Sequence, residues 1–226
     1  MSPIQVLSIS DTVSEQVYSP QIRRLFGDAA LAISCGDLPY YYVEYVVSGL
    51  DVPVFYVRGN HAKVVEYGNA GRRTSPAGAV DLHRQVVFRK GLLLAGVEGS
   101  VRYKPGPYQY TQRQMWGHVF ALVPRLLLNR AMHGRYLDIF VTHAPPWGIH
   151  DMPDWPHQGI RAFRWLIEVF KPAYHFHGHI HLYGPDQRYF SRFKETEIIN
   201  TYGHRYLKLE RLPWDKPPSQ PNPEPQ

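Results

Sequence analysis

The chain of 226 residues contains one cysteine, no long apolar run and no block of like charges. The single cysteine, Cys35, excludes an internal disulfide framework and any zinc site built from cysteines. No stretch approaches the about 18 consecutive apolar residues of a membrane-spanning helix, and the N-terminus has no basic segment followed by an apolar one. We therefore expect no membrane span, no secretory signal and a cytoplasmic location.

Positive charges outnumber negative ones, with 25 Lys and Arg against 19 Asp and Glu, and the formal net charge is +6. This balance favours anionic partners such as phosphates, nucleic acids and acidic membranes. The basic residues are scattered, and the sequence contains no established nucleic-acid-binding motif. A nucleic-acid partner is therefore supported by charge alone, and it would bind with a steep salt dependence.

The body of the chain has the composition of one folded domain. Apolar residues make up 44% and aromatic residues 14%, which is enough for a buried core at this length. Six of the 20 prolines fall within the last 14 residues, which show no apolar periodicity. We expect a domain over residues 1–212 and an extended, proline-rich tail over residues 213–226 that adds nothing to the core. The sequence indicates no oligomeric state.

The first part of the chain alternates between strand-like and helix-like segments. Apolar runs typical of strands cover residues 4–10, 30–35 and 53–57, and helices are expected at 20–26 and 40–47. Alternation of this kind predicts a largely parallel sheet covered by helices.

The middle of the chain predicts a loop followed by a long helix. A glycine- and arginine-rich loop is expected over residues 68–78. Thr111 and Gln114 fit a capping box that starts a helix running towards Met132, with a break or kink at Pro124. The other predicted elements are a hairpin of 85–89 and 92–97, a helix at 159–170, and strands at 136–142, 173–176, 189–192, 197–201 and 206–210.

Polar residues with metal-binding side chains follow the predicted strands. They are Asp11, Asp37, Asn60, His61, His143, His179 and His181. Each has an ordinary structural explanation when taken singly, such as a turn capped by an aspartate. The carboxyl edge of a parallel sheet is, however, where ligand sites form, and carboxylates, an amide oxygen and imidazoles are ligands of Mn, Fe or Zn. His179 and His181 are two residues apart, so in extended backbone they face the same side.

The order of these motifs resembles the calcineurin-like metallophosphoesterase superfamily. The motifs are Asp11, Gly36-Asp37, Gly59-Asn60-His61, Thr142-His143 and Gly178-His179-Ile180-His181. The resemblance implies an α/β (α+β) fold, a four-layer sandwich of two packed mixed β-sheets flanked by helices. It implies a metal-dependent phosphohydrolase with two divalent cations, in which activated water attacks a phosphomonoester or phosphodiester in line. Manganese suits this ligand set best, and iron or zinc would also fit.

The resemblance also implies a role for each residue. Asp37 would bridge both metals, and His61 would be the catalytic residue, donating a proton or hydrogen bond to the phosphate or the leaving oxygen. The remaining ligands would be Asp11 and His181 at the first metal, and Asn60, His143 and His179 at the second.

Two positions depart from the family pattern. Val13 stands where the family has a metal-binding histidine, and Ala62 where it has a carboxylate that orients the catalytic histidine. The first metal site is therefore incomplete, with Glu15 as a conceivable substitute ligand or simply a solvated surface residue. Both departures support an alternative function, a catalytically weak binding or scaffold protein that keeps the metallophosphoesterase fold.

Three further segments have a functional and a structural interpretation. Residues 150–157 could wall the substrate pocket or support the ligands, or form an ordinary structured loop. Arg102 and Tyr103 could contact phosphate or lie at the surface. The stretch of Leu126 to Leu128, with its arginines, could be a membrane-surface or partner-binding helix, although a helix packed on the core with a basic outer face is the favoured interpretation.

Overall fold

The computed structural model describes residues 3–68, 71–184 and 189–210. The first of its two large sheets has the strand order β15-β1-β2-β3-β6. Its strands are β1 (Ile4–Ser10), β2 (Ala29–Ser34), β3 (Val54–Tyr56), β6 (Ala79–Asp81) and β15 (Gly203–Leu209). The neighbouring strands β1, β2, β3 and β6 pair in parallel, and β15 pairs antiparallel with β1. The carboxyl ends of β1, β2 and β3 therefore meet at one edge.

The second large sheet has the order β13-β14-β12-β11-β8-β7. Its strands are β7 (Val86–Arg89), β8 (Leu92–Val97), β11 (Ile139–Thr142), β12 (Tyr174–His177), β13 (Phe190–Phe193) and β14 (Thr196–Asn200). The four central strands are parallel and the two outer pairs antiparallel. The predicted hairpin of β7 and β8 is confirmed.

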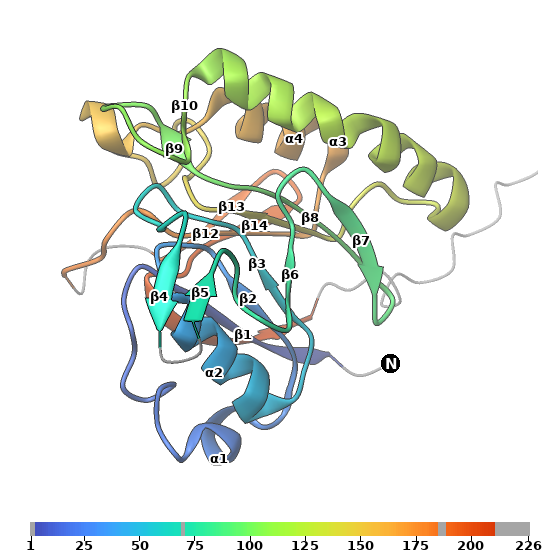
Figure 1. Ribbon diagram of the computed structural model, residues 1–226. Helices are drawn as coiled ribbons and strands as arrows, with labels where there is room; N and C mark the ends of the chain where they lie inside the picture. The colour runs from blue at the N-terminus through green and yellow to red at the C-terminus, as the bar shows by residue number, and fades with distance from the viewer. Residues whose placement is uncertain (1–2, 69–70, 185–188, 211–226) are drawn as a thin grey trace, which may run out of the picture.

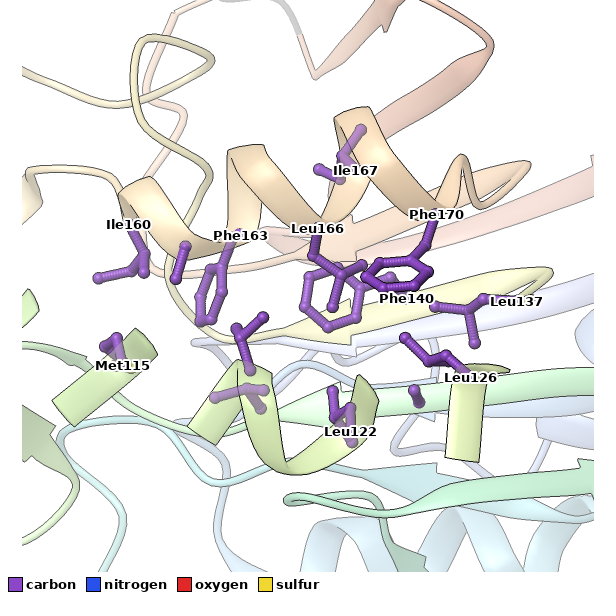
Figure 2. Packing of buried hydrophobic residues seen from close by; sticks show 14 of the residues in the cluster. Met115, Leu122, Leu126, Leu137, Phe140, Ile160, Phe163, Leu166, Ile167 and Phe170 are labelled. Atoms are coloured by element: carbon purple, nitrogen blue, oxygen red, sulfur yellow. The ribbon is translucent and has the colours of Figure 1, made fainter. Parts of the chain in front are cut away.

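The two sheets pack face to face and carry helices on their outer faces (Figure 1). Residues of both sheets, among them Ile33 and Phe176, share one buried apolar cluster between them. The helices α1 (Ile22–Phe26) and α2 (Tyr40–Leu50) bury their apolar side chains against the first sheet. The helices α3 (Gln112–His133) and α4 (Arg161–Phe170) do the same against the second, as Figure 2 shows for the residues around Phe140. The four-layer sandwich of mixed sheets is thus confirmed.

The long helix α3 begins where the sequence predicts and is continuous to His133. The side chain of Thr111 accepts a hydrogen bond from the backbone of Gln114, whose own side chain bonds back to the backbone of Thr111. The helix continues through Pro124, so it is not broken there, while the alternative of a kink stays a prediction. Pro124 lies on the exposed side of the helix, where water can satisfy the backbone carbonyl that a proline leaves without a partner.

The prediction of a loop over residues 68–78 is also corrected. Strand β5 (Gly71–Arg73) lies within it and pairs with β4 (Glu66–Gly68), which ends at its first residue, in a two-stranded antiparallel sheet. Strands of three residues offer too short a pattern for periodicity to reveal. The side chain of Arg73 lies 3.3 Å from the carboxylate of Glu44, which ties this small sheet to α2.

Two further short strands and one 3₁₀ helix of the described residues lie outside the two large sheets and the four α-helices. They are β9 (Ser100–Val101), β10 (Gln109–Tyr110) and the 3₁₀ helix η1 (Trp155–His157). Within the described part of the chain, no helix combines the length and the apolar content needed to cross a bilayer. The predicted tail, residues 213–226, lies outside the described residues, so the domain boundary at residue 212 stays a prediction.

Candidate metal centre

The strand-end residues of both sheets converge at one edge of the sandwich. The backbone of Asp11, after β1, donates to the carbonyl of Gly36, after β2, at 3.1 Å. The backbone of Gly178, after β12, donates to the carbonyl of His143, after β11, at 2.9 Å. The backbone of His179 then joins the two sheets by donating to the carboxylate of Asp11 at 3.0 Å. The topology therefore gathers residues that are up to 168 positions apart in the sequence.

The backbone turns sharply at three of these residues. Asp11, Asp37 and His179 have positive φ angles of 66°, 56° and 68°. This left-handed conformation is uncommon for residues other than glycine and costs about 1 kcal/mol or more. Asp11 and Asp37, which both have this conformation, contribute their carboxylates to one cluster.

Two glycines of the motifs allow the strand ends to approach closely. A Cβ atom on Gly59 would lie 2.1 Å from the Oδ1 atom of Asp37, and one on Gly178 would lie 1.9 Å from the Oγ atom of Ser10. No ordinary side chain fits at these separations. The glycines thus have a steric role in the site, which is to leave room for the carboxylates of Asp11 and Asp37.

Asp11, Asp37 and His143 form the centre of the site. One possible ligand atom from each lies within 4.8 Å of the others, and of the described residues these are the three that form such a group. The side chain of His143 is fully buried and that of Asp37 is 8% exposed. Two carboxylates held this close in a buried place repel each other unless a cation or proton lies between them.

The hydrogen bonds of His143 provide a test of whether a cation fits. Its Nδ1 atom lies 2.8 Å from the backbone carbonyl oxygen of Cys35. A carbonyl can only accept, so Nδ1 carries the hydrogen and Nε2 carries the lone pair of the neutral ring. That Nε2 faces two oxygens, Oδ1 of Asn60 at 2.9 Å and Oδ2 of Asp37 at 3.1 Å. Three electron-rich atoms directed at one point fit a divalent cation.

The pKa values of the metal-free site follow from this arrangement. Burial opposes the charged forms, but the attraction between Asp37 and His143 outweighs it. It lowers the pKa of Asp37 to about 2 and raises the pKa of His143 to about 9. Burial also raises the pKa of Asp11. In the absence of metal, a proton on Nε2 of His143 thus takes the position that the donor atoms offer to a cation, and metal binding would displace it.

Asn60 is held in place by a residue far from it in the sequence. Its Oδ1 atom is directed at His143, while its Nδ2 atom donates to the hydroxyl oxygen of Tyr103 at 3.3 Å. The sequence marks Tyr103 only as a candidate for phosphate contact. Its observed contact is with Asn60, and it fixes which end of the amide faces the site.

The two histidines after β12 differ in their environments. The Nε2 atom of His179 lies 2.9 Å from the carbonyl oxygen of Pro156, so Nε2 carries the hydrogen and Nδ1 keeps the lone pair. Burial lowers the pKa of His179 to about 3, which keeps the ring neutral. His181 has a side chain that is 43% exposed, with Nε2 3.9 Å from Asp11. Its Nδ1 atom lies 2.6 Å from the hydroxyl of Tyr183.

His61 is exposed and lies at the rim of the site. Its backbone N–H donates to the Oδ1 atom of Asp37 at 2.8 Å. This bond orients the carboxylate, so that its other oxygen faces His143. Of the predicted residues, the structure brings Asp11, Asp37 and His143 into one cluster, with the others in contact with it or at its edge.

Comparison with known proteins agrees with this geometry. A model of the calcineurin-like phosphoesterase family matches residues 13–183 of the chain. This chain belongs to the calcineurin-like phosphoesterase family. The matched segment contains all the predicted site residues except Asp11, which lies two positions before it. Curated protein sequences give no match.

Solved structures show the same fold. The protein TT1561 of Thermus thermophilus superposes with a TM-score of 0.60 at 16% sequence identity, covering 89% of this chain and 90% of that chain. The phosphopantetheinyl hydrolase PptH of Mycobacterium tuberculosis superposes with a TM-score of 0.50 at 12% identity, covering 89% of each chain. At such identities the likeness is one of fold.

The two departures from the family pattern have distinct structural settings. Val13 is half-buried and packs against the apolar cluster between the first sheet and α2, so the position lies at the edge of the core. Glu15, the conceivable substitute ligand, is exposed. Ala62, where the family pattern has a carboxylate, donates its backbone N–H to the carbonyl of Gly59 at 3.3 Å.

The loop of residues 150–157 lies against the site from the side of the second sheet. The carbonyl of Pro156 in this loop contacts His179. His150, also in the loop, forms a chain of hydrogen bonds with His177 and Ser191. The Nδ1 atom of His150 lies 2.9 Å from Nε2 of His177, and its Nε2 atom lies 2.7 Å from the hydroxyl of Ser191. Burial lowers the pKa of His150 to about 4 and that of His177 well below its ordinary value. The loop therefore supports the residues behind the candidate ligands.

The buried neutral histidines make the metal-free protein sensitive to acid. Burial lowers the pKa of His150 to about 4 and that of His175 to about 3, whereas the unfolded chain takes up a proton near pH 6.5. The contribution of these two histidines to stability is thus complete above about pH 6.5 and is lost as the pH falls towards their pKa values in the folded protein. Thermal melts between pH 4 and 8 in the presence of a chelator measure this loss. The variant His175→Phe should show a shallower loss, and an unchanged profile would contradict this explanation.

One charged cluster beside the site was not predicted from the sequence. Arg58, one residue before the Gly59 turn, forms ion pairs with Asp81 and, at 3.5 Å, with Glu98. Its guanidinium also donates to the hydroxyl of Tyr56 at 3.1 Å. These contacts anchor the turn that carries Asn60. The two carboxylates lie 23 and 40 positions from Arg58 in the sequence, so no local pattern indicates them.

Proposed function

We propose that this protein hydrolyses phosphate esters with divalent cations held at the candidate metal centre. The proposed ligands are Asp11, Asp37, Asn60, His143, His179 and His181. The observation that carries the proposal is the convergence of two carboxylate oxygens, an amide oxygen and a histidine Nε2 atom at one buried point. Membership of the calcineurin-like phosphoesterase family supports the same chemistry.

The donor atoms favour a particular class of metal. Oxygen and imidazole ligands without thiolate suit Mn²⁺, and also Fe or Zn. Bound cations supply Lewis acidity to a phosphate oxygen and lower the pKa of water, so that it can attack phosphorus at neutral pH.

Asp37 and His61 would have separate roles in the proposed reaction. Asp37 would bridge two cations, since each of its oxygens has a separate direction, one towards the backbone of His61 and one towards His143. His61 would donate a proton or hydrogen bond to the phosphate or the leaving oxygen, because its exposed ring stands at the rim beside that carboxylate.

Removal of metal is expected to abolish activity. Excess chelator should stop hydrolysis of both an aryl phosphomonoester and an aryl phosphodiester, because the proposed mechanism activates water only through a cation. Mn²⁺ should restore more activity than Mg²⁺, since the set contains imidazole nitrogens. Rates measured on both substrates with each metal test this and identify the preferred ester. Full activity in excess chelator would contradict the proposal.

Two cations are expected to bind with unequal affinities. The site of Asp37, Asn60, His143 and His179 has a full set of ligands, whereas the site of Asp11, Asp37 and His181 lacks the nitrogen that Val13 cannot supply. Calorimetric titration with Mn²⁺ should show one tight and one weak equivalent.

Val13→His tests the cause of this difference. It should tighten the weak equivalent, while Val13→Ile, which keeps the apolar contact, should leave both affinities unchanged. Two equally tight cations in the unmodified protein would mean that another residue completes the first site. A protein that binds one cation and hydrolyses neither ester would instead fit the alternative function, a binding or scaffold protein.

A further inference from the structure

The outer face of α3 is apolar. The side chains that α3 buries include Val119, which belongs to the cluster between α3, α4 and the second sheet. Met115, Leu122 and Leu126 point towards the second sheet and α4 (Figure 2). At 100° per residue, the opposite face of the helix is formed by another set. Its members are Phe120, Ala121, Pro124, Leu127, Leu128, Ala131 and Met132, all exposed.

Large apolar side chains on this face are exposed to solvent. Phe120 is 52% exposed, Leu127 54%, and Met132 63%. We call this set the α3 outer face. From Gly117 to Met132 no polar residue lies within it, and Arg113 points in the same direction at the N-terminal end of the helix. Figure 1 places α3 along the outside of the molecule, and the side chains that it buries pack on the second sheet and α4. The expectation of a basic outer face is therefore corrected: the centre is apolar, and basic residues lie at its margins.

Neighbouring side chains extend the α3 outer face at its N-terminal end. There, Phe120 packs against Trp116 and Trp165, with ring centroids 5.3 and 5.4 Å away. Apolar surface that spans several elements marks a site of interaction more strongly than single exposed residues.

The charged side chains of α3 are all positive. α3 contains Arg113, Arg125 and Arg130 and no aspartate or glutamate, and Arg89 and Lys90 follow Phe88 in the adjoining hairpin. The nearest helix, α4, carries one carboxylate, Glu168, which lies 3.4 Å from Arg164 and is thus paired. A face of this kind attracts anions and repels cations.

We propose that the α3 outer face binds the surface of an anionic lipid bilayer, with α3 lying in the plane of the interface. An apolar face of Phe, Leu and Met with arginines at its margins is the composition of an interfacial helix. An aromatic ring, here that of Phe120, enters the same boundary favourably. The inference is independent of the proposed hydrolysis.

A second copy of the chain fits this face less well. Across a two-fold axis the same surface meets itself, so that Arg113, Arg125 and Arg130 of one copy would approach those of the other. No carboxylate of α3 would offset the repulsion. An anionic bilayer supplies both the apolar depth and the negative charge.

Binding to vesicles tests the proposal. The full chain should sediment with vesicles of phosphatidylcholine and phosphatidylglycerol at low salt, and much less with phosphatidylcholine alone or at high salt. Phe120→Ser with Leu127→Ser should lower the partition coefficient by about tenfold or more, since both side chains lose apolar contact. Arg113→Gln with Arg125→Gln should lower it on anionic vesicles and flatten the salt dependence.

A matched control uses apolar residues elsewhere on the surface. Val64 is 53% exposed and Tyr67 82%, and replacing both by serine should leave vesicle binding unchanged. Thermal melts check that each variant folds. If the Phe120/Leu127 variant does not fold, vesicle binding by the Arg113/Arg125 variant still tests the proposal. Absence of binding to anionic vesicles, or unchanged binding by the Phe120/Leu127 variant, would overturn the proposal. Self-association that this variant abolishes, without vesicle binding, would also overturn it in favour of a second copy.

Discussion

Replacing Asp37 by asparagine is expected to abolish metal-dependent phosphoester hydrolysis. Asparagine has nearly the same shape as aspartate but no negative charge, and Asp37 lies with Asp11 and His143 in the candidate metal centre. A cation's effect on the reaction is worth several kcal/mol, so its loss should lower kcat/KM by about a thousandfold or more. Metal content and steady-state kinetics of the variant measure both consequences.

A matched control separates the charge at the site from the substitution itself. Asp51 is exposed at the end of α2 and has a φ of 57°, a conformation that asparagine adopts readily. Asp51→Asn should therefore retain both metal and activity. If Asp37→Asn kept full activity and full metal content, the proposed function would be wrong.

Replacing Gly59 by alanine is expected to cause a large loss of stability together with loss of metal. The new Cβ atom would lie 2.1 Å from Oδ1 and 2.7 Å from the backbone nitrogen of Asp37, and a backbone atom cannot move aside cheaply. Overpacking of this kind costs about 3 kcal/mol, which corresponds to a fall in Tm of roughly 6–12 °C for a domain of this size. Melting curves with and without Mn²⁺ measure the effect.

Gly117 is the control for this substitution. It lies in α3 with no atom within 4 Å of an added Cβ. Alanine is favoured over glycine inside a helix by about 1 kcal/mol, so Gly117→Ala should raise Tm slightly. A Gly59→Ala variant as stable as the unmodified protein would show that the turns at the strand ends can move apart, and that the site is less rigid than the contacts indicate.

The fold and the residues of the candidate site could largely be predicted from the sequence. Alternating strands and helices determine a parallel sheet, and the carboxyl ends of parallel strands share one edge. Asp11, Asp37 and His143 follow such strands, so their convergence results from local patterns and from the order of the motifs. Their distances agree with that prediction, while the role of each residue stays a prediction.

Only the tertiary structure decided what holds these residues in position. The hydrogens on His143 and His179 are fixed by the backbone carbonyls of Cys35 and Pro156. A carbonyl belongs to every residue, so no side-chain pattern in the sequence can reveal it. Tyr103 contacts Asn60 across 43 positions of the sequence for the same reason, because a contact of this kind depends on how the loops pack.

The surface of α3 shows the same division between sequence and structure. The sequence by itself determined the helix and its start at Thr111, since a capping box and helical periodicity are local properties. It did not determine which face is buried, because Leu126, Leu127 and Leu128 are chemically identical. Packing against the second sheet buries Leu126 alone, and a rotation of 100° per residue leaves its two neighbours exposed beside Arg125. Exposure is a property of the packed sandwich, and it turned an apparent core segment into a candidate binding surface.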